Sequence, residues 1–344
     1  MLQKLATQAL TVLPPEAAHR ATIELLKSPF VPTVAAGGDP ALRISLAGMA
    51  LPNPIGMAAG FDKNAEVPAA LLRLGFGFVE VGAVTPRPQP GNPSPRVFRL
   101  RKDAAVINRY GFNNDGLRKI GQRLQAQSVK PGIVGINLGA NKDSDDRIQD
   151  YVESLQALEG YVAFLTVNVS SPNTQGLRSL QGKDALRDLL GRVLVARTTN
   201  KPVFVKVAPD LTDEERSDIV AAALEAGVDG MIVSNTTLSR EGLKSAARDQ
   251  AGGLSGRPLF EKSTAILRDF AKETKGKLPL VGVGGIFSAN DALTKIKAGA
   301  TAVQLYTALV YEGPGLVGRM RRDLPLLLRA EGFDTVKDAV GAAL

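Results

Sequence analysis

The strongest constraint on the fold is an alternation of eight apolar runs with segments of helical periodicity. Several runs are continuous and β-branched, which is typical of parallel strands covered on both faces. The predicted strands are Pro54–Ala58, Phe76–Val84, Gly132–Leu138, Val162–Val169, Pro202–Val207, Gly230–Val233, Pro279–Val283 and Ala302–Tyr306. The predicted helices are Ala65–Leu74, Asn114–Gln127, Asp146–Glu159, Lys183–Arg197, Asp213–Ala226, Phe260–Glu273 and Ala289–Lys297, with Asp213 and Ser288 as N-caps.

Strands that alternate with helices in this way predict an α/β fold, a (β/α)₈ TIM barrel, which typically takes about 250 residues. A doubly wound open sheet is the alternative. The N-terminal part of the chain lies outside the repeat. We therefore divide the chain into a small N-terminal helical extension, residues 1–45, and a catalytic barrel, residues 46–344.

The N-terminal extension carries two apolar stripes at helical spacing, separated by Pro14-Pro15. The first stripe comprises Leu2, Leu5, Ala9 and Leu13, and the second comprises Ala18, Thr22, Leu25 and Leu26. Such a segment is either a helical hairpin packed on the barrel or an interfacial element with an apolar face toward lipid.

Composition excludes several kinds of chemistry. The chain has no cysteine, so it has no disulfides, thiolate metal sites, protein-ligated iron–sulfur clusters or cysteine base. Its single histidine, His19, leaves no room for a multi-histidine zinc site and argues against a histidine-based triad. A general base must then be Ser, Thr, Tyr, Lys, Asp or Glu.

The chain is basic, with a formal net charge of +8. This favours anionic substrates, phosphate cofactors or an anionic membrane surface. Basic residues are scattered and aromatic residues are only 5% of the chain, so we expect no nucleic-acid partner. No apolar run is long enough to span a bilayer, and the N-terminus does not resemble a secretory signal.

Polar side chains follow the predicted strands. The segment Asn168–Thr174 places two amides and two adjacent hydroxyls after the fourth strand, where parallel α/β folds place their chemistry. Taken alone, this segment is equally typical of a polar Ser-Pro-Asn turn. The run Gly282–Ile286 after the seventh strand and the pair Tyr306-Thr307 at the end of the eighth predict a phosphate site, because these loops often bind phosphate in barrels.

Two lysines and four asparagines extend this pattern. Lys63 follows the first strand and Lys206 ends the fifth, either as solvated strand-end residues or as cations beside a developing anion. Asn108, Asn137, Asn168 and Asn235 are expected in one barrel mouth. Four such amides indicate a site for a planar, amide-rich ligand such as a flavin or a pyrimidine.

These residues carry a resemblance to a known family. The chain resembles class 2 dihydroorotate dehydrogenases, the quinone-reducing, membrane-associated type. The matching blocks are Pro15–His19, Ala58–Lys63, Thr85–Asn92, Pro95–Leu100, Asn108–Asn114, Asn168–Thr174, Gly176–Arg178, Ser234–Leu238, Gly252–Leu259 and Tyr306–Leu309. Soluble class 1 relatives use a cysteine as the base, and this chain has Ser171 at that position.

The resemblance implies oxidation of dihydroorotate to orotate with FMN, one per chain, followed by electron transfer to ubiquinone or menaquinone. Ser171 would be the catalytic base, with Thr174 and Phe112 shaping its proton path. The implied cofactor-binding residues are Ala59, Gly60, Lys63, Ala83, Asn137, Asn168, Lys206, Ser234, Gly256, Gly285, Tyr306 and Thr307, with Ala83 in place of the threonine common in relatives. The implied substrate-binding residues are Lys63, Asn108, Arg109, Tyr110, Gly111, Phe112, Asn168, Asn173, Asn235 and Thr236.

The quinone tunnel implied by the resemblance involves His19, Arg99 and Tyr306. A peripheral monomer at the cytoplasmic face of the cell (inner) membrane is expected. The alternatives are another FMN-dependent pyrimidine-ring oxidoreductase and a flavin- or phosphate-binding barrel without turnover.

Overall fold

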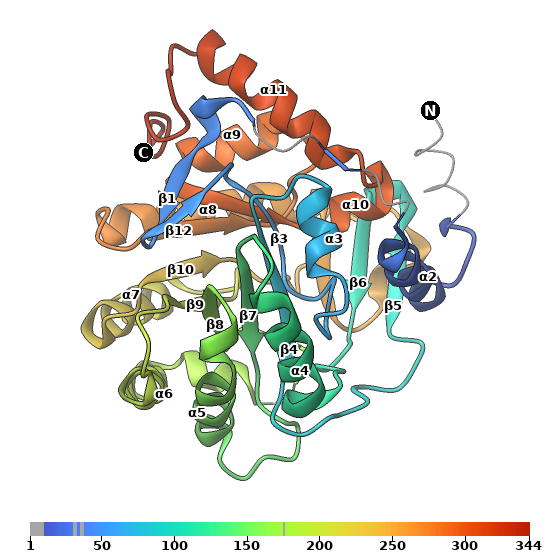
Figure 1. Cartoon of the computed structure of the whole chain (residues 1–344), viewed down its shortest axis with the longest axis vertical. Helices are drawn as coiled ribbons and strands as arrows, with labels where there is room; N and C mark the ends of the chain where they lie inside the picture. The colour runs from blue at the N-terminus through green and yellow to red at the C-terminus, as the bar shows by residue number, and fades with distance from the viewer. Residues whose placement is uncertain (1–9, 30–32, 35–37, 175) are drawn as a thin grey trace.

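Eight parallel strands close into a barrel in a computed structural model that describes residues 10–29, 33–34, 38–174 and 176–344 (Figure 1). The strands are β3 (Ile55–Met57), β4 (Phe78–Val84), β7 (Val134–Leu138), β8 (Phe164–Asn168), β9 (Val203–Val207), β10 (Gly230–Val233), β12 (Leu280–Val283) and β13 (Ala300–Leu305). The last strand pairs with the first, Val303 opposite Ile55. This closure confirms the predicted barrel and contradicts the open sheet.

Seven helices lie where the sequence predicts them, around the outside of the barrel (Figure 1). They are α3 (Pro68–Arg73), α4 (Gly116–Ser128), α5 (Arg147–Leu158), α6 (Lys183–Ala196), α7 (Asp213–Ala226), α8 (Phe260–Thr274) and α9 (Ala289–Lys297). Ser288 caps α9 as predicted. The predicted Asp213 cap is wrong by one residue, because Thr212 accepts the hydrogen bond from the Glu215 amide and forms a capping box.

The barrel interior is built in layers by the two-residue alternation of each strand. At the amino-terminal end, Phe78, Phe164 and Phe204 meet edge to face, with ring centroids 6.1 and 5.7 Å apart. Gly56 lies opposite Phe78, and a Cβ there would come within 2.3 Å of its ring, so the small residue makes room for the aromatic layer. Two residues further along β4 the interior becomes polar, at Glu80.

A second, three-stranded antiparallel sheet was not predicted from the sequence. It consists of β5 (Val97–Leu100), β6 (Ala105–Asn108) and β11 (Gly253–Gly256), which belong to insertions after β4 and β10. A hairpin of β1 (Ile44–Leu46) and β2 (Met49–Leu51) precedes the barrel. Two helices, α10 (Thr307–Glu312) and α11 (Leu316–Ala330), follow β13.

The second predicted N-terminal stripe forms helix α2 (Pro15–Lys27), which lies beside β5 (Figure 1). It buries Ala18, Ile23 and Leu26, while Leu25 remains 59% exposed. Glu16 of this helix accepts a 2.9 Å hydrogen bond from Arg96 Nε and thereby ties the helix to the insertion after β4. Leu2, Leu5 and Ala9 lie outside the described residues. The helix therefore packs on the barrel and also keeps an apolar side chain exposed.

Candidate active site

The carboxyl ends of the barrel strands open into a cavity of about 540 Å³, a size typical of cofactor sites. Strand ends line one side, the β5–β6–β11 sheet another, and α2 the far end. Nearly all predicted site residues line it: His19, Ala59, Gly60, Lys63, Ala83, Arg99, Asn108, Tyr110, Gly111, Phe112, Asn137, Asn168, Ser171, Asn173, Lys206, Ser234, Asn235, Thr236, Gly256, Gly285, Tyr306 and Thr307. The structure thus brings residues from distant segments to one cavity.

A hydrogen-bonded network of buried side chains forms the cavity floor. Glu80 accepts hydrogen bonds from Asn137 Nδ2 at 2.7 Å and from Gln304 Nε2 at 2.6 Å. Asn137 Oδ1 in turn accepts from Asn168 Nδ2 at 2.8 Å. All four side chains are buried, so these hydrogen bonds hold each amide in one orientation.

The network continues to the loop after β8. Asn168 Oδ1 accepts from Ser170 Oγ at 3.0 Å, and the same hydroxyl accepts from Asn235 Nδ2 at 3.0 Å. The main-chain carbonyl of Asn168 accepts from the buried Tyr151 hydroxyl at 2.7 Å. These contacts fix the ends of β8 and β10 relative to each other.

Ser171 follows Ser170 and is buried. Its Oγ accepts a hydrogen bond from the Asn173 amide at 3.3 Å. Arg178 holds the start of this loop, because its guanidinium donates to the carbonyl oxygens of Ser170 and Thr236, each at 3.2 Å, and pairs with Asp210. The Ser171 hydroxyl is therefore held at the cavity wall by a loop anchored to two strand ends.

Lys206 carries a buried ammonium group into the cavity. Among the described residues it has no hydrogen-bond acceptor, which is unusual for a buried lysine. Burial lowers its pKa, and the nearby Glu80 carboxyl group opposes this effect. A buried cation without a protein acceptor is suited to an electron-rich ligand.

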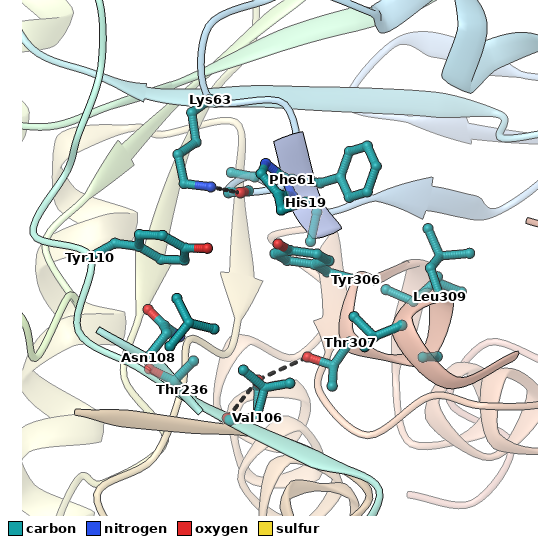
Figure 2. A pocket seen from close by; sticks show the side chains of 18 of the residues that line it. His19, Phe61, Lys63, Val106, Asn108, Tyr110, Thr236, Tyr306, Thr307 and Leu309 are labelled. Carbon is teal, nitrogen blue, oxygen red and sulfur yellow. Dashed lines mark hydrogen bonds between the residues drawn. The ribbon is translucent and has the colours of Figure 1, made fainter. Parts of the chain in front are cut away.

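Lys63 provides a second cation. Its ammonium donates to the carbonyl of Gly60 at 2.7 Å and lies 4.1 Å from the centroid of the Tyr110 ring (Figure 2). Burial lowers the pKa of Lys63 to about 8. Its charge therefore titrates close to neutral pH.

Aromatic rings form the end of the cavity nearest α2. The Phe61 ring packs edge to face against His19 at 5.4 Å and against Tyr306 at 5.5 Å (Figure 2). Burial, and to a smaller extent the positive charges of Lys63 and Arg20, lowers the pKa of His19 to about 3, so its imidazole is neutral. Burial also raises the pKa of Tyr306.

Arg99 joins this end of the cavity to the segment before α2. Its guanidinium donates to the carbonyl oxygens of Thr11 and Leu13 at 2.8 and 2.9 Å. The hydroxyls of Tyr110 and Tyr306 point toward each other across the cavity (Figure 2). This end is thus mainly apolar, with a few polar groups at its walls.

Glycines and hydroxyls form the remaining wall. Gly284 and Gly285 have φ angles of 110° and 76°, a region that disfavours side chains, and a Cβ on Gly285 would lie 2.5 Å from Phe260 Cα. Thr307 Oγ1 donates to Ser255 Oγ at 2.8 Å. The bare glycine backbone suits a phosphate, and the amides with the Lys206 ammonium suit a flavin ring, so the donors present fit FMN.

The comparisons with known proteins agree with this site. A family model described as dihydroorotate dehydrogenase matches residues 41–328. The chain belongs to the dihydroorotate dehydrogenase family.

Full-length relatives within this family are named dihydroorotate dehydrogenase (quinone). The protein of that name from Parvibaculum lavamentivorans is 56% identical, covering 98% of this chain and 97% of the relative. The one from Brucella anthropi is 54% identical, covering 98% and 94%. A crystal structure of DHODH from Eimeria tenella in complex with ferulenol superposes with a TM-score of 0.92 at 41% identity and covers 95% of each chain.

One residue expected from the dihydroorotate dehydrogenase resemblance lies away from the cavity. Arg109 donates to Gln250 Oε1 and the Ala251 carbonyl, both at 3.1 Å, and to the Pro95 carbonyl at 2.8 Å. Its guanidinium also stacks on the Phe98 ring at 4.7 Å. These contacts hold the two insertions together, and the expected contact of Arg109 with the substrate stays a prediction.

Thr174 does not line the cavity either, but it is buried, and its hydroxyl has no hydrogen-bond partner among the described residues. Three further polar residues at the site were missed by the sequence reasoning. Glu80 and Gln304 lie beneath the asparagines, and Ser255 holds Thr307. Glu80 could have been identified from the sequence, because it is a charged residue inside the apolar run of β4.

Proposed function

We propose that this protein oxidises dihydroorotate to orotate with bound FMN and passes the electrons to a quinone, in pyrimidine biosynthesis. The observation that carries this proposal is the single cavity that joins Ser171 and the barrel-mouth amides to the aromatic end beside α2. The names of the full-length relatives support the same reaction.

Ser171 is the proposed catalytic base. FMN, when bound, would supply a two-electron acceptor for the hydride that leaves one ring carbon of the substrate. Ser171 Oγ takes the proton from the neighbouring carbon, so the substrate loses the two hydrogens that orotate lacks. Burial of Ser171 limits the access of bulk water to this hydroxyl. The buried Thr174 hydroxyl, three residues further along the loop, and the Phe112 ring, which lines the cavity, would shape its proton path.

Amides and one cation bind the substrate in this proposal. Lys63 faces the carboxylate. The groups that bind the pyrimidine ring are Asn108, Asn168, Asn173, Asn235 and Thr236, with backbone from Tyr110, Gly111 and Phe112. Asn173 Nδ2 already donates to Asn108 Oδ1 at 3.4 Å, so two of these amides lie side by side before substrate arrives.

The flavin would lie over the polar floor. Lys206 would stabilise negative charge at the pyrimidine edge of the flavin ring, as a preorganised cation does. Asn137, Asn168, Ser234 and Gly256 would hold the ring and ribityl chain, and Ala59, Gly60, Lys63 and Ala83 would pack along it. Gly285, Tyr306 and Thr307 would hold the phosphate.

The quinone would enter at the aromatic end of the cavity. His19, Arg99 and Tyr306 are its proposed polar contacts, and ubiquinone and menaquinone both suit an apolar channel. Residues 1–45 would form the entrance and residues 46–344 the catalytic barrel. In the described residues no helix is long and apolar enough to cross a membrane. Peripheral attachment to the cytoplasmic face of the inner membrane, as a monomer, completes the proposal.

A two-stage flavin assay tests the function. The purified protein should contain one FMN per chain, should lose its yellow colour when dihydroorotate is added without oxygen, and should regain it when a quinone analogue is added. Orotate should form in the first stage in an amount equal to the FMN present. Stable yellow colour with dihydroorotate would contradict the proposal, and bleaching without quinone reoxidation would contradict its second half alone.

A further inference from the structure

Lys295 is a fully buried lysine that the site described above does not use. It lies on α9, and its exposed fraction is 0%. Its ammonium donates to Ser263 Oγ at 2.8 Å and to Thr264 Oγ1 at 3.0 Å, both on α8, and it lies 5.1 Å from the centroid of the Phe260 ring. In the part of the chain that the structure describes, it forms no ion pair.

Lys295 lies behind the turn of Gly284 and Gly285, which lines the cavity. A Cβ built on Gly282 of β12 would lie 3.2 Å from Lys295 Cδ. Ser263 Oγ, which receives the lysine hydrogen bond, is also within 3.1 Å of the Gly284 carbonyl. One hydroxyl therefore connects the ammonium to the turn that carries Gly284 and Gly285.

An unpaired buried ammonium is costly, because no water replaces the lost solvation. Burial lowers the pKa of Lys295 to about 7, and the carboxylates of Asp291 and Glu261 only partly oppose this effect. The hydroxyls of Ser263 and Thr264 do not need the ammonium group as a hydrogen-bond partner. Both also donate to the Phe260 carbonyl, at 3.1 and 2.7 Å. Local packing thus gives no reason for a charge at this point.

We propose that Lys295 is a positioning residue for the flavin phosphate: through Ser263 it orients the Gly284–Gly285 turn, and its positive charge offsets the phosphate bound on the other side. The inference rests on the proposed FMN function. It assigns a role to a side chain that lines no part of the cavity and touches neither flavin nor substrate.

FMN and riboflavin distinguish this role, because riboflavin has the same ring and ribityl chain but no phosphate. Flavin would be removed from the full-length protein, and rebinding of each flavin would be followed by fluorescence quenching in wild type, Lys295→Met and Lys297→Met. Lys297 is the matched control, since it lies on the same helix with the same charge but forms a surface ion pair with Glu331. Rebinding by wild type must restore dihydroorotate oxidation.

In Lys295→Met we expect the affinity for FMN to fall about tenfold or more, the effect of losing one charge near a dianion in a low-dielectric region. Riboflavin affinity should change much less, and Lys297→Met should match wild type with both flavins. Equal losses for FMN and riboflavin would show that Lys295 only supports the fold locally and would overturn the inference. So would unchanged FMN affinity.

A second variant keeps the test informative if Lys295→Met does not fold. Lys295→Gln removes the charge but retains a hydrogen-bond donor for Ser263, and the same selective loss of FMN binding is expected. If neither neutral variant folds, Lys295 is structural and the proposal is wrong. If wild type itself binds neither flavin, the proposed function fails, which is a different result from equal losses in the variant.

Discussion

Asn137 Nδ2 donates a 2.7 Å hydrogen bond to Glu80 Oε1 in the middle of the barrel, and the same asparagine accepts a hydrogen bond from Asn168. A buried carboxyl group therefore lies directly beneath the amides of the candidate site. It is also the group that opposes the effect of burial on Lys206. The charge beneath the proposed flavin depends on both residues.

Glu80→Gln should raise the reduction potential of the bound flavin, because it removes a nearby negative charge while preserving the side-chain shape. Lys206→Met should lower the potential, since it removes the cation that favours the reduced ring. We expect each shift to be roughly 30 mV or more, equivalent to about 1.4 kcal/mol for a two-electron couple. Redox titration with reference dyes measures both. The control is Glu159→Gln, because Glu159 is a buried carboxyl group at the opposite end of the barrel, and this variant should leave the potential unchanged. Shifts of the same sign in the Glu80 and Lys206 variants would refute this account.

Ser171→Ala should retain FMN but slow flavin reduction by dihydroorotate by about 10²–10⁴-fold, the usual contribution of a general base. Stopped-flow bleaching measures the rate, and orotate titration measures whether binding persists. Ser171→Cys should recover part of the rate, since a thiol can also accept the proton, while Ser179→Ala on the exposed side of the same loop should behave as wild type. Fast bleaching in Ser171→Ala would remove Ser171 from the mechanism.

Orotate affinity should depend on the protonation of Lys63. With its pKa lowered to about 8, Lys63 is cationic below pH 8 and neutral above it in the ligand-free protein. Because the anion binds the cationic form, the dissociation constant should be constant near pH 7 and rise through pH 8, by up to about tenfold per pH unit. Lys63→Met should bind orotate weakly with no such rise. Perturbation of the flavin absorbance follows binding, and an identical pH profile in the variant would contradict the assignment.

The exposed apolar residues near α2 should support binding to lipid. Val12 and Leu25 are 82% and 59% exposed, and Leu25 also lines the cavity. Replacing both with Glu should reduce sedimentation with vesicles and slow reoxidation by a long-chain quinone, while bleaching by dihydroorotate stays normal. Val129→Glu with Val195→Glu is the control, since these valines, 86% and 88% exposed, lie directly after α4 and on α6. Equal effects from both pairs would mean that charge alone is responsible.

The barrel was predictable because the residue types in each strand reflect how that strand is buried. The run of β8, for example, is buried at every position, and Thr166 is its only polar residue before Asn168, as expected for a strand covered on both sides. The three-stranded sheet was not predictable by the same reasoning. Its strands have four residues each, and β6 pairs with β11, so that Asn108 lies opposite Gly253 although they are far apart in the sequence. Short strands of this kind depend on partners that periodicity cannot reveal.

The candidate site was predictable to the level of residues but not of contacts. Strand-end position brought Asn137 and Lys206 to one mouth, since all parallel strands end there. It could not separate Asn108 from its neighbour Arg109, whose long side chain reaches the other insertion instead. Nor could it indicate that Lys295, in the last turn of the amphipathic helix α9, lies beneath the turn of Gly284 and Gly285.

Closure of the barrel also sets an order of events during synthesis. Phe61 contacts His19 near the start of the chain and Tyr306 near its end, and among the described strands β3 pairs with β4 and β13. At about 5–20 residues per second, a ribosome needs tens of seconds to proceed from β3 to β13. Helix α2 is synthesised long before Tyr306, so the contact between the Phe61 and Tyr306 rings can form only at the end of that interval. The end of the cavity beside α2 therefore reaches its final form only when the last strand of the barrel is in place.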